Sequence, residues 1–427
     1  MQDHVIEKKT KGKISSIEDF FDFFEPAEVS PPEKIFSLDF HVKKMKNKKK
    51  LPSFLDIAEP RDAEKIAGLF QEEYNGTYPY KNLSDVDSLQ EIIEDENNKW
   101  LTIKVDNNKI IGCVALDLFP SQKKALHHGF LLKSSYRHKI DTYRAFLGST
   151  LYYWKTYCDQ INIWYGEIRT YSSVMQFGSL VVGLKPIGFF PNKDIFFNNV
   201  ESDILVVTYN KNTISNQRDS LSPKIIREAT KCFDYTRKRF PEIGFVPVSN
   251  PVLNVDRIRT SILKGKLKLE LNEDHLKYIK IRISLNNETY LTCEYNRYSQ
   301  CIEKTKYSIK TLEELSALLQ EMKEIKNRIR ARYIECYVPA NNPEHQRLFY
   351  EYGFQPRGYV PCWEYNAKTS TFEDSILFNS FDGALSKNIE LLPETRQLLR
   401  AINLLKNLRE PKGTAVKAVK SQSLPTN

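Results

Sequence analysis

The strongest constraint on the fold of this chain is a segment that occurs twice. Residues 176–191 match residues 346–361 without a gap, and the shared positions include a glutamine, two glycines and two prolines. A second echo follows each copy, at residues 201–205 and 373–377. Because glycine and proline set the backbone direction at helix ends and strand starts, equal spacing implies an equal chain path. The pattern predicts two copies of one fold.

Length and apolar content agree with two cores. The chain has 427 residues, of which 41% are hydrophobic and 12% aromatic, which is more than one ordinary core can hold. The first copy is predicted to run strand, two helices, three strands, helix, strand, helix and two strands. We expect an α/β (α+β) fold with a charged, partly disordered N-terminal extension (1–53), domain 1 (54–210), a helical connector (211–244), domain 2 (245–383), a C-terminal helix (384–410) and a disordered tail (411–427).

Two helices outside the repeat are predicted from their spacing. The connector helix should begin at Ser222-Pro223 and run through Phe233, with Ile225 and Ile226 on its apolar face. An amphipathic helix is expected around residues 394–408 near the end of the chain.

Composition narrows the compartment and the chemistry. No apolar run approaches the length that crosses a bilayer, and Asp3, Glu7 and Lys8 stand where a signal peptide would be apolar, so we expect a soluble, cytoplasmic protein with no membrane partner. The seven cysteines are scattered and form no Cys-x-x-Cys pair, which favours neither a disulfide framework nor a metal site. Most are expected to be small buried hydrophobes.

The net charge of +9 does not by itself indicate a nucleic-acid partner. Much of the excess lies in the cluster Lys43 to Lys50, ahead of the first predicted domain. No zinc finger, RNA-recognition signature or helix-turn-helix pattern accompanies it, so a solvated spacer is favoured over a nucleic-acid-binding arm.

One segment resembles a known family. The spacing of Asn342, Leu348, Phe349, Gly353 and Phe354 resembles the fourth helix and its exit in GNAT acyltransferases, and residues 333–338 fit the strand before it. The element order of the first domain and its opening residues 60–67 look similar to the same superfamily. The resemblance covers roughly residues 54–210 and, less completely, 245–380. It implies two tandem GNAT-like domains, each a mixed, mostly antiparallel sheet flanked by helices.

The resemblance also implies a cofactor, acetyl-CoA or another acyl-CoA, in a V-shaped split between the fourth and fifth strands. In the family, an Arg/Gln-x-x-Gly-x-Gly/Ala turn holds the diphosphate through backbone N–H groups, as helix N-termini do for anions in general. Both glycines are absent here, and a plain helix start is the alternative reading. No such turn is visible in the second copy, which is not expected to bind CoA. The residues that correspond to the cofactor site are Leu131, Leu132, Lys133, Arg137, His138, Lys139, Ile140, Asp141 and Thr142.

Catalysis in the family uses a base and, often, a tyrosine acid. The tyrosine position corresponds to Ser179 and Phe349, neither of which can serve as that acid. We therefore name Glu167, Asp117 and Tyr171 as catalytic candidates, with His127 and His128 also considered. Each has a plain alternative: Asp117 as an exposed strand residue, the histidines in a solvated turn, and Glu167 as an ion-pair partner of Arg169, with which it shares a strand face.

The loop after the first predicted helix corresponds to the acceptor side of the family's site. Carboxylates and aromatic rings suit a cationic amine, through charge and cation–π attraction. A tyrosine-rich turn packed on the sheet is the alternative. The predicted acceptor-binding residues are Glu72, Glu73, Tyr74, Tyr78, Tyr80 and Arg169.

Taken together, the residues and the resemblance predict an acyl-CoA-dependent N-acyltransferase. The transfer would be of an acetyl group to an amine of a small molecule or peptide, with the first domain binding the cofactor and the second completing the acceptor pocket. The alternative is a non-catalytic GNAT-like module that binds a ligand or a protein.

Overall fold

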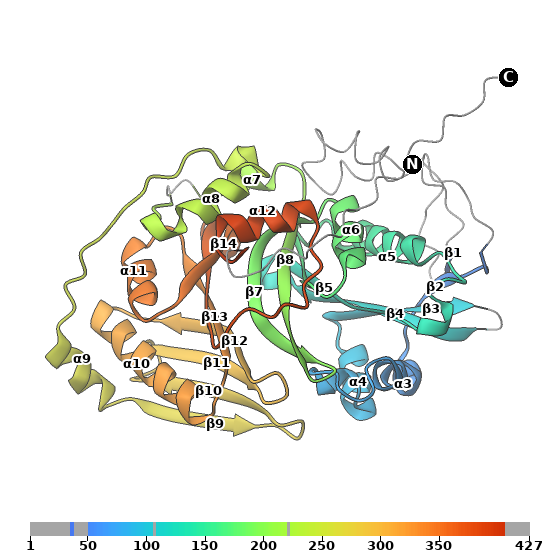
Figure 1. Cartoon of the computed structure of the whole chain (residues 1–427), viewed down its shortest axis with the longest axis horizontal. Coiled ribbons are helices and arrows are strands. Elements are labelled where there is room, and N and C mark those ends of the chain that lie inside the picture. The colour runs from blue at the N-terminus through green and yellow to red at the C-terminus, as the bar shows by residue number, and fades with distance from the viewer. Residues whose placement is uncertain (1–34, 38–49, 106–107, 220–222, 406–427) are drawn as a thin grey trace.

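The computed structural model describes residues 35–37, 50–105, 108–219 and 223–405 (Figure 1). Most of the lysine cluster, Lys43 to Lys49, and the predicted tail at 411–427 lie outside the described residues.

The strands form one mixed sheet in the order β1-β2-β3-β4-β5-β6-β8-β7-β14-β15-β13-β12-β11-β10-β9. In the first half of the chain they are β1 (Ile35–Ser37), β2 (Phe54–Ile57), β3 (Asn98–Val105), β4 (Lys109–Phe119), β5 (Lys124–Leu132), β6 (Ile163–Arg169), β7 (Lys185–Phe196) and β8 (Asn199–Tyr209). In the second half they are β9 (Lys268–Glu273), β10 (Tyr278–Ser284), β11 (Tyr290–Asn296), β12 (Cys301–Ser308), β13 (Tyr333–Pro339), β14 (Gln355–Asn366) and β15 (Thr371–Phe381).

Helices cover both faces of the sheet. In the first half, α3 and α4 lie on one side of the strands and α5 and α6 on the other (Figure 1). The helices are α3 (Ala63–Glu73), α4 (Val86–Glu94), α5 (Thr142–Tyr157), α6 (Ser173–Val181), α7 (Thr213–Gln217), α8 (Thr230–Arg237), α9 (Arg257–Lys264), α10 (Leu312–Arg328), α11 (Pro343–Glu351) and α12 (Pro393–Ala401).

The two halves of the sheet have the same strand order. From the outer edge inward, β2-β3-β4-β5-β6-β8-β7 is matched by β9-β10-β11-β12-β13-β15-β14. Each run has one parallel pair, β5 with β6 and β12 with β13, and the other neighbours are antiparallel. The predicted fold class and the predicted element order of the first copy are confirmed. The second half differs at its outer edge, where a short turn replaces the two helices between β2 and β3.

The two halves join through two glycines from the repeated segment. Gly188 of β7 pairs with Gly358 of β14. A Cβ on Gly358 would lie 2.6 Å from the carbonyl oxygen of Ile187 and 2.7 Å from the Cα of Gly188, closer than real Cβ contacts come. A side chain at Gly358 is therefore excluded by the backbone of β7. One hydrophobic cluster continues across this junction, and a second lies under α3 and α4.

Each half binds the chain segment that follows the other half. Gln176 of α6 accepts from the Leu392 N–H and donates to the Glu390 carbonyl, at 3.2 and 2.7 Å. Gln346 of α11 holds residues 224–226 in the same way, at 3.0 Å for each bond. The following helices are exchanged as well, because α12 packs on β7 and α8 packs on β14.

This exchange explains why the predicted connector helix begins late. Residues 223–226 do not form a helix, because the backbone of Lys224 bonds to Ala340 and Gln346, and the Ile226 N–H bonds to Gln346. The helix α8 starts only at Thr230. The C-terminal helix is likewise confined to Pro393–Ala401 within the described residues, and 384–392 run outside any helix.

Candidate active site

The strands β5 and β6 open a gap in the sheet of the first half. They pair at three positions only, from Lys124 with Ile163 to Leu126 with Tyr165, and then continue without pairing to each other. Glu167 of β6 is exposed when backbone and side chain are taken together, although its side chain is ion-paired and only 28% exposed. Part of the exposed area therefore belongs to its backbone. The backbone of Glu167 therefore reaches solvent at this gap, where it can accept an extended ligand arm through main-chain hydrogen bonds.

A β-bulge lies on the other side of the gap. Gly129 and Phe130 of β5 together oppose Val114 of β4, and Gly129 has a φ of +63° that a side chain disfavours. Such a bulge interrupts the ladder and leaves its extra residue unpaired at the edge of the gap.

The corresponding gap in the second half is closed. Pairing of β12 with β13 continues to Thr305 and Cys336. The half-buried Tyr307 lies beyond it, with its hydroxyl 3.0 Å from His345 Nδ1 and its ring 5.5 Å from the ring of Phe349. Burial lowers the pKa of His345 to about 4, so this imidazole is neutral at physiological pH. Phe349 is part of this aromatic packing.

The turn predicted to bind the diphosphate does not form a backbone cradle. The N–H groups of Arg137, Lys139 and Ile140 donate to carbonyl groups within the turn itself. Ile140 is buried, and Asp141 caps α5 by accepting from the Arg144 N–H at 3.2 Å. A carboxylate therefore occupies the helix N-terminus where an anion would otherwise bind.

The predicted phosphate-binding cations contact the predicted acceptor-binding carboxylates. Lys133 Nζ lies 2.7 Å from Glu72, and Arg137 Nη2 lies 2.7 Å from Glu73. Glu73 also accepts from the Ser134 N–H at 2.8 Å. A ligand phosphate would have to replace these contacts. Of the other predicted cofactor-binding residues, Leu131 and Leu132 are buried, whereas His138 and Lys139 are exposed. The Thr142 hydroxyl donates to the Arg137 carbonyl.

Asp117 is held next to His128. The His128 Nε2 atom lies 2.8 Å from Asp117 Oδ1 on the neighbouring strands β4 and β5, with both side chains about one-quarter exposed. Both histidines lie inside β5 rather than in a turn. His127 is half-buried, its ring packs on Phe146 and Tyr153, and burial lowers its pKa to about 3.

Glu167 contacts a buried lysine that the sequence analysis did not identify. Lys193 of β7 is 1% exposed, and its ammonium lies 2.7 Å from Glu167, 3.3 Å from Glu335 and 3.6 Å from Glu303. The last two carboxylates come from the second half. They and Glu167 raise the pKa of Lys193, whereas burial raises the pKa of Glu335 to about 7. We call these four residues the Lys193 cluster.

Arg169 pairs with Glu201 instead of Glu167. Two guanidinium nitrogens lie 2.9 and 2.8 Å from the Glu201 carboxylate, and the guanidinium stacks 3.8 Å from the Phe196 ring. Its other aromatic neighbours are Tyr74 and Tyr171. Tyr171 is 59% exposed at the exit of β6.

The three predicted acceptor-binding tyrosines lie together on the sheet. Tyr74 and Tyr78 pack against each other with ring centroids 4.6 Å apart, and the Tyr80 hydroxyl donates to Asp194 at 3.1 Å. Burial raises the pKa of all three, so they remain neutral phenols. The structure therefore brings Arg169, Tyr74, Tyr78 and Tyr80 to one face of the sheet, whereas Glu72 and Glu73 turn toward the start of α5.

Ser179 and Phe349 stand at the positions that correspond to the family's acid, and both are buried. The Ser179 hydroxyl donates to the Met175 carbonyl at 2.9 Å within α6.

Within the described ranges, each helix is too short or too polar to cross a membrane. The same residues contain no cluster of three His, Cys, Asp or Glu side chains suited to a metal ion. All seven cysteines are free thiols, and six of them are buried.

Comparison with known proteins finds matches among solved structures. Spermidine N-acetyltransferase from Vibrio cholerae in complex with CoA and spermine is 15% identical, with a TM-score of 0.33, over 37% of this chain and 95% of that chain. A mutant form of the same enzyme is 14% identical, with a TM-score of 0.33, over 38% of this chain and 95% of that one. Ribosomal-protein-S5-alanine acetyltransferase from Vibrio fischeri is 15% identical, with a TM-score of 0.32, over 39% of this chain and 98% of that chain.

Each of these matched structures is of an N-acetyltransferase of the GNAT superfamily and spans less than half of this chain. No family model and no curated protein matches the sequence.

Proposed function

We propose that the protein is an acyl-CoA-dependent N-acyltransferase whose first half binds the cofactor. The observation that carries this proposal is the open gap between β5 and β6, flanked by the bulge at Gly129 and by the His128–Asp117 pair. A gap with free main-chain groups on one edge suits the amide-containing arm of CoA, and a nearby imidazole suits amine chemistry.

The two ends of the proposed site are not equally suited to bind acyl-CoA. The gap offers main-chain partners, but the turn before α5 offers no backbone cradle, so Lys133, Arg137 and Lys139 would have to bind the phosphates through side chains. When bound, acyl-CoA supplies an activated thioester. A main-chain donor at the Gly129 bulge is well placed to stabilise negative charge that develops on a carbonyl oxygen in the gap.

His128 is the base in this proposal. One ring nitrogen is held by Asp117, which orients the imidazole, and the other can accept a proton from an attacking amine. The amine attacks only when neutral, so the reaction needs this acceptor. Tyr171 remains a candidate acid because its hydroxyl lies on an exposed side chain near Arg169.

The acceptor is a small-molecule or peptide amine, bound where the two halves meet. Carboxylates of both halves lie on this side of the sheet, in the Lys193 cluster, beside the tyrosines at Tyr74 to Tyr80. Negative charge and aromatic rings together favour a cationic ligand. The second half contributes Glu303 and Glu335 to this region but no second cofactor gap.

Calorimetric titration of acetyl-CoA into the intact protein tests the cofactor. Saturable heat that is weakened in Arg137→Ala, but not in Lys65→Ala on the exposed side of α3, would support the proposal. Acetyl transfer to a panel of polyamines and amino acids then tests the enzyme. An absence of heat and of thermal stabilisation with millimolar acetyl-CoA would reject cofactor binding.

One observation favours a non-catalytic binding module as the second candidate. Asp141 caps α5 and places a negative charge at the site where the diphosphate would bind. A module that retained the gap but not the chemistry would bind acetyl-CoA, or only its pantetheine arm, and transfer no acetyl group to any amine of the panel.

A further inference from the structure

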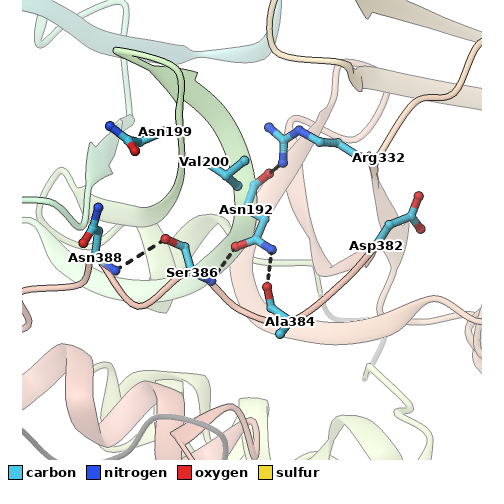
Figure 2. A pocket seen from close by; sticks show the side chains of 8 residues that line it. All are labelled: Asn192, Asn199, Val200, Arg332, Asp382, Ala384, Ser386 and Asn388. Atoms are coloured by element: carbon cyan, nitrogen blue, oxygen red, sulfur yellow. Dashed lines mark hydrogen bonds between the residues drawn. The ribbon is translucent and has the colours of Figure 1, made fainter.

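A pocket of about 290 Å³ lies at the β7–β8 hairpin (Figure 2). At its centre, the Asn192 side chain donates to the Ala384 carbonyl and accepts from the Ser386 N–H, both at 2.9 Å. The segment that leaves the second half therefore forms one wall. The pocket is lined by Asn192, Asn199, Val200, Arg332, Asp382, Ala384, Ser386 and Asn388.

The pocket contains one cation without a counter-ion. Arg332 donates to the carbonyls of Asn192 and Lys193, the second at 3.0 Å, and its buried Nε has no hydrogen-bond partner. Among the described residues, no carboxylate comes within ion-pair distance of Arg332. Asp382 also lines the pocket, but its carboxylate is held by Lys326 at 2.8 and 2.9 Å. The charges of Arg332 and Asp382 in the lining cancel, and Lys326 beside Asp382 brings the net charge of these three side chains to about +1, which favours an anion.

The other half contains a matching site that the protein fills with its own side chains. Cys362 occupies the place of Asn192: both have positive φ, at +53° and +56°, and both donate their N–H at 2.9 Å to the neighbouring strand. The acceptor is Asp374 in one half and Ser202 in the other.

The filling residue is Arg218. Arg218 stands six residues before Lys224, whose N–H donates to the Ala340 carbonyl. In the other half, Ala384 stands six residues before Glu390, whose N–H donates to the Thr170 carbonyl. Arg218 and Ala384 therefore occupy equivalent positions. Arg218 pairs with Asp374 at 2.9 and 3.0 Å, which leaves a pocket of about 10 Å³. Ala384 and Ser202 cannot fill the equivalent space, so the larger pocket remains.

We infer that this pocket binds a small oxyanionic metabolite, such as a hydroxy acid, whose anion is held by Arg332. A guanidinium binds carboxylate and phosphate oxygens through paired N–H donors. The side chains of Asn199, Ser386 and Asn388 supply further donors and acceptors for hydroxyl or amide groups of the ligand. The volume suits a molecule of metabolite size rather than a CoA.

A variant that copies the filled site is the test. Ala384→Arg combined with Ser202→Asp reproduces the Arg218–Asp374 pair and should fill the pocket. Ser215→Arg, at an exposed position of α7, is the control because it also adds one arginine. The intact proteins are titrated with L-malate, with inorganic phosphate and with neutral glycerol, by calorimetry and by thermal melting.

We expect saturable binding of L-malate to the wild type and to Ser215→Arg, weakened at least about tenfold in the filled variant. Binding of phosphate alone, with the same loss, would identify the anion as a phosphate. If the filled variant does not fold, Arg332→Gln takes its place, with circular dichroism to establish the fold. Equal binding to wild type and filled variant, or no binding of either anion at millimolar concentration, would overturn the inference.

Discussion

The ammonium of Lys193 lies 2.7 Å from the carboxylate of Glu167, in a site where the lysine is 1% exposed. Glu303 and Glu335 complete its surroundings from the other half of the chain. Removing the ammonium by Lys193→Met leaves these carboxylates buried without their cation. We expect the free energy of unfolding, measured by urea denaturation, to fall by about 3 to 5 kcal/mol.

The control for this variant is Lys304→Met. Lys304 contacts Glu294 at 2.8 Å, but its side chain is 66% exposed, so its ion pair should contribute less than about 1 kcal/mol. Equal losses in the two variants would show that the Lys193 cluster is not what holds the halves together.

The raised pKa of Glu335 predicts a pH dependence of stability. Its pKa in the folded protein is about 7, above its usual 4.5, because it is buried. The folded state therefore binds more protons than the unfolded state between these values, and stability must fall as pH rises through this window. In Glu335→Gln this contribution is absent. Chemical denaturation of both proteins at several pH values should give a flatter profile for the variant; parallel profiles would contradict the assignment.

Most of the fold could be predicted from local sequence patterns. The spacing of Thr311 and Glu314 is typical of a capping box, and both of its hydrogen bonds are present at the start of α10. The echo of Gly188 and Gly358 predicted a shared chain path, and the two sheet halves do have the same strand order. The sequence could not indicate that these two glycines pair with each other, because the echo says nothing about how two copies are arranged.

The candidate site depends on contacts between residues far apart in the sequence, and this limits how much of the site the sequence can predict. Lys193 and Glu335 are 142 residues apart in the sequence, so neither predicts the other. The signal that could have identified Lys193 is its position: a charged pair, Lys193-Asp194, interrupts an aromatic strand. Likewise, Glu201 gave no indication that it would bind Arg169, which left Glu167 as the plausible but wrong partner.

Asp141 should weaken phosphate binding while it stabilises α5. Asp141→Ser keeps a side-chain oxygen that can cap the helix but removes the negative charge. We expect acetyl-CoA affinity, measured by calorimetry at low salt, to increase several-fold. Asp141→Ala removes the charge and the cap together, and should lower the free energy of unfolding by about 1 kcal/mol. Unchanged affinity in both variants would place the diphosphate elsewhere.

The His128–Asp117 pair should act as one unit in acetyl transfer. Loss of a general base costs about 100-fold to 10,000-fold in rate, and His128→Asn removes the base. Asp117→Asn leaves the base but not the hydrogen bond to an anionic carboxylate. We expect the double variant to be no slower than His128→Asn, in steady-state assays over a pH series. Multiplicative losses would mean that the two side chains act separately.

Gly358 should be intolerant of the smallest side chain. A methyl group there would overlap the backbone of Ile187 and Gly188, so β14 would have to move away from β7 at the position where they pair. Overpacking of this kind typically costs about 1 to 3 kcal/mol, and we expect Gly358→Ala to lose stability in that range by urea denaturation. Gly68→Ala is the matched control, because its Cβ would meet no atom within 4 Å and it lies inside α3. Alanine is the better helix former, so this variant should gain up to about 1 kcal/mol. Both changes add one methyl group, so changes of opposite sign in the free energy of unfolding would assign the loss at Gly358 to the contact between the two halves. A Gly358→Ala variant as stable as the wild type would show that the junction does not depend on this close approach.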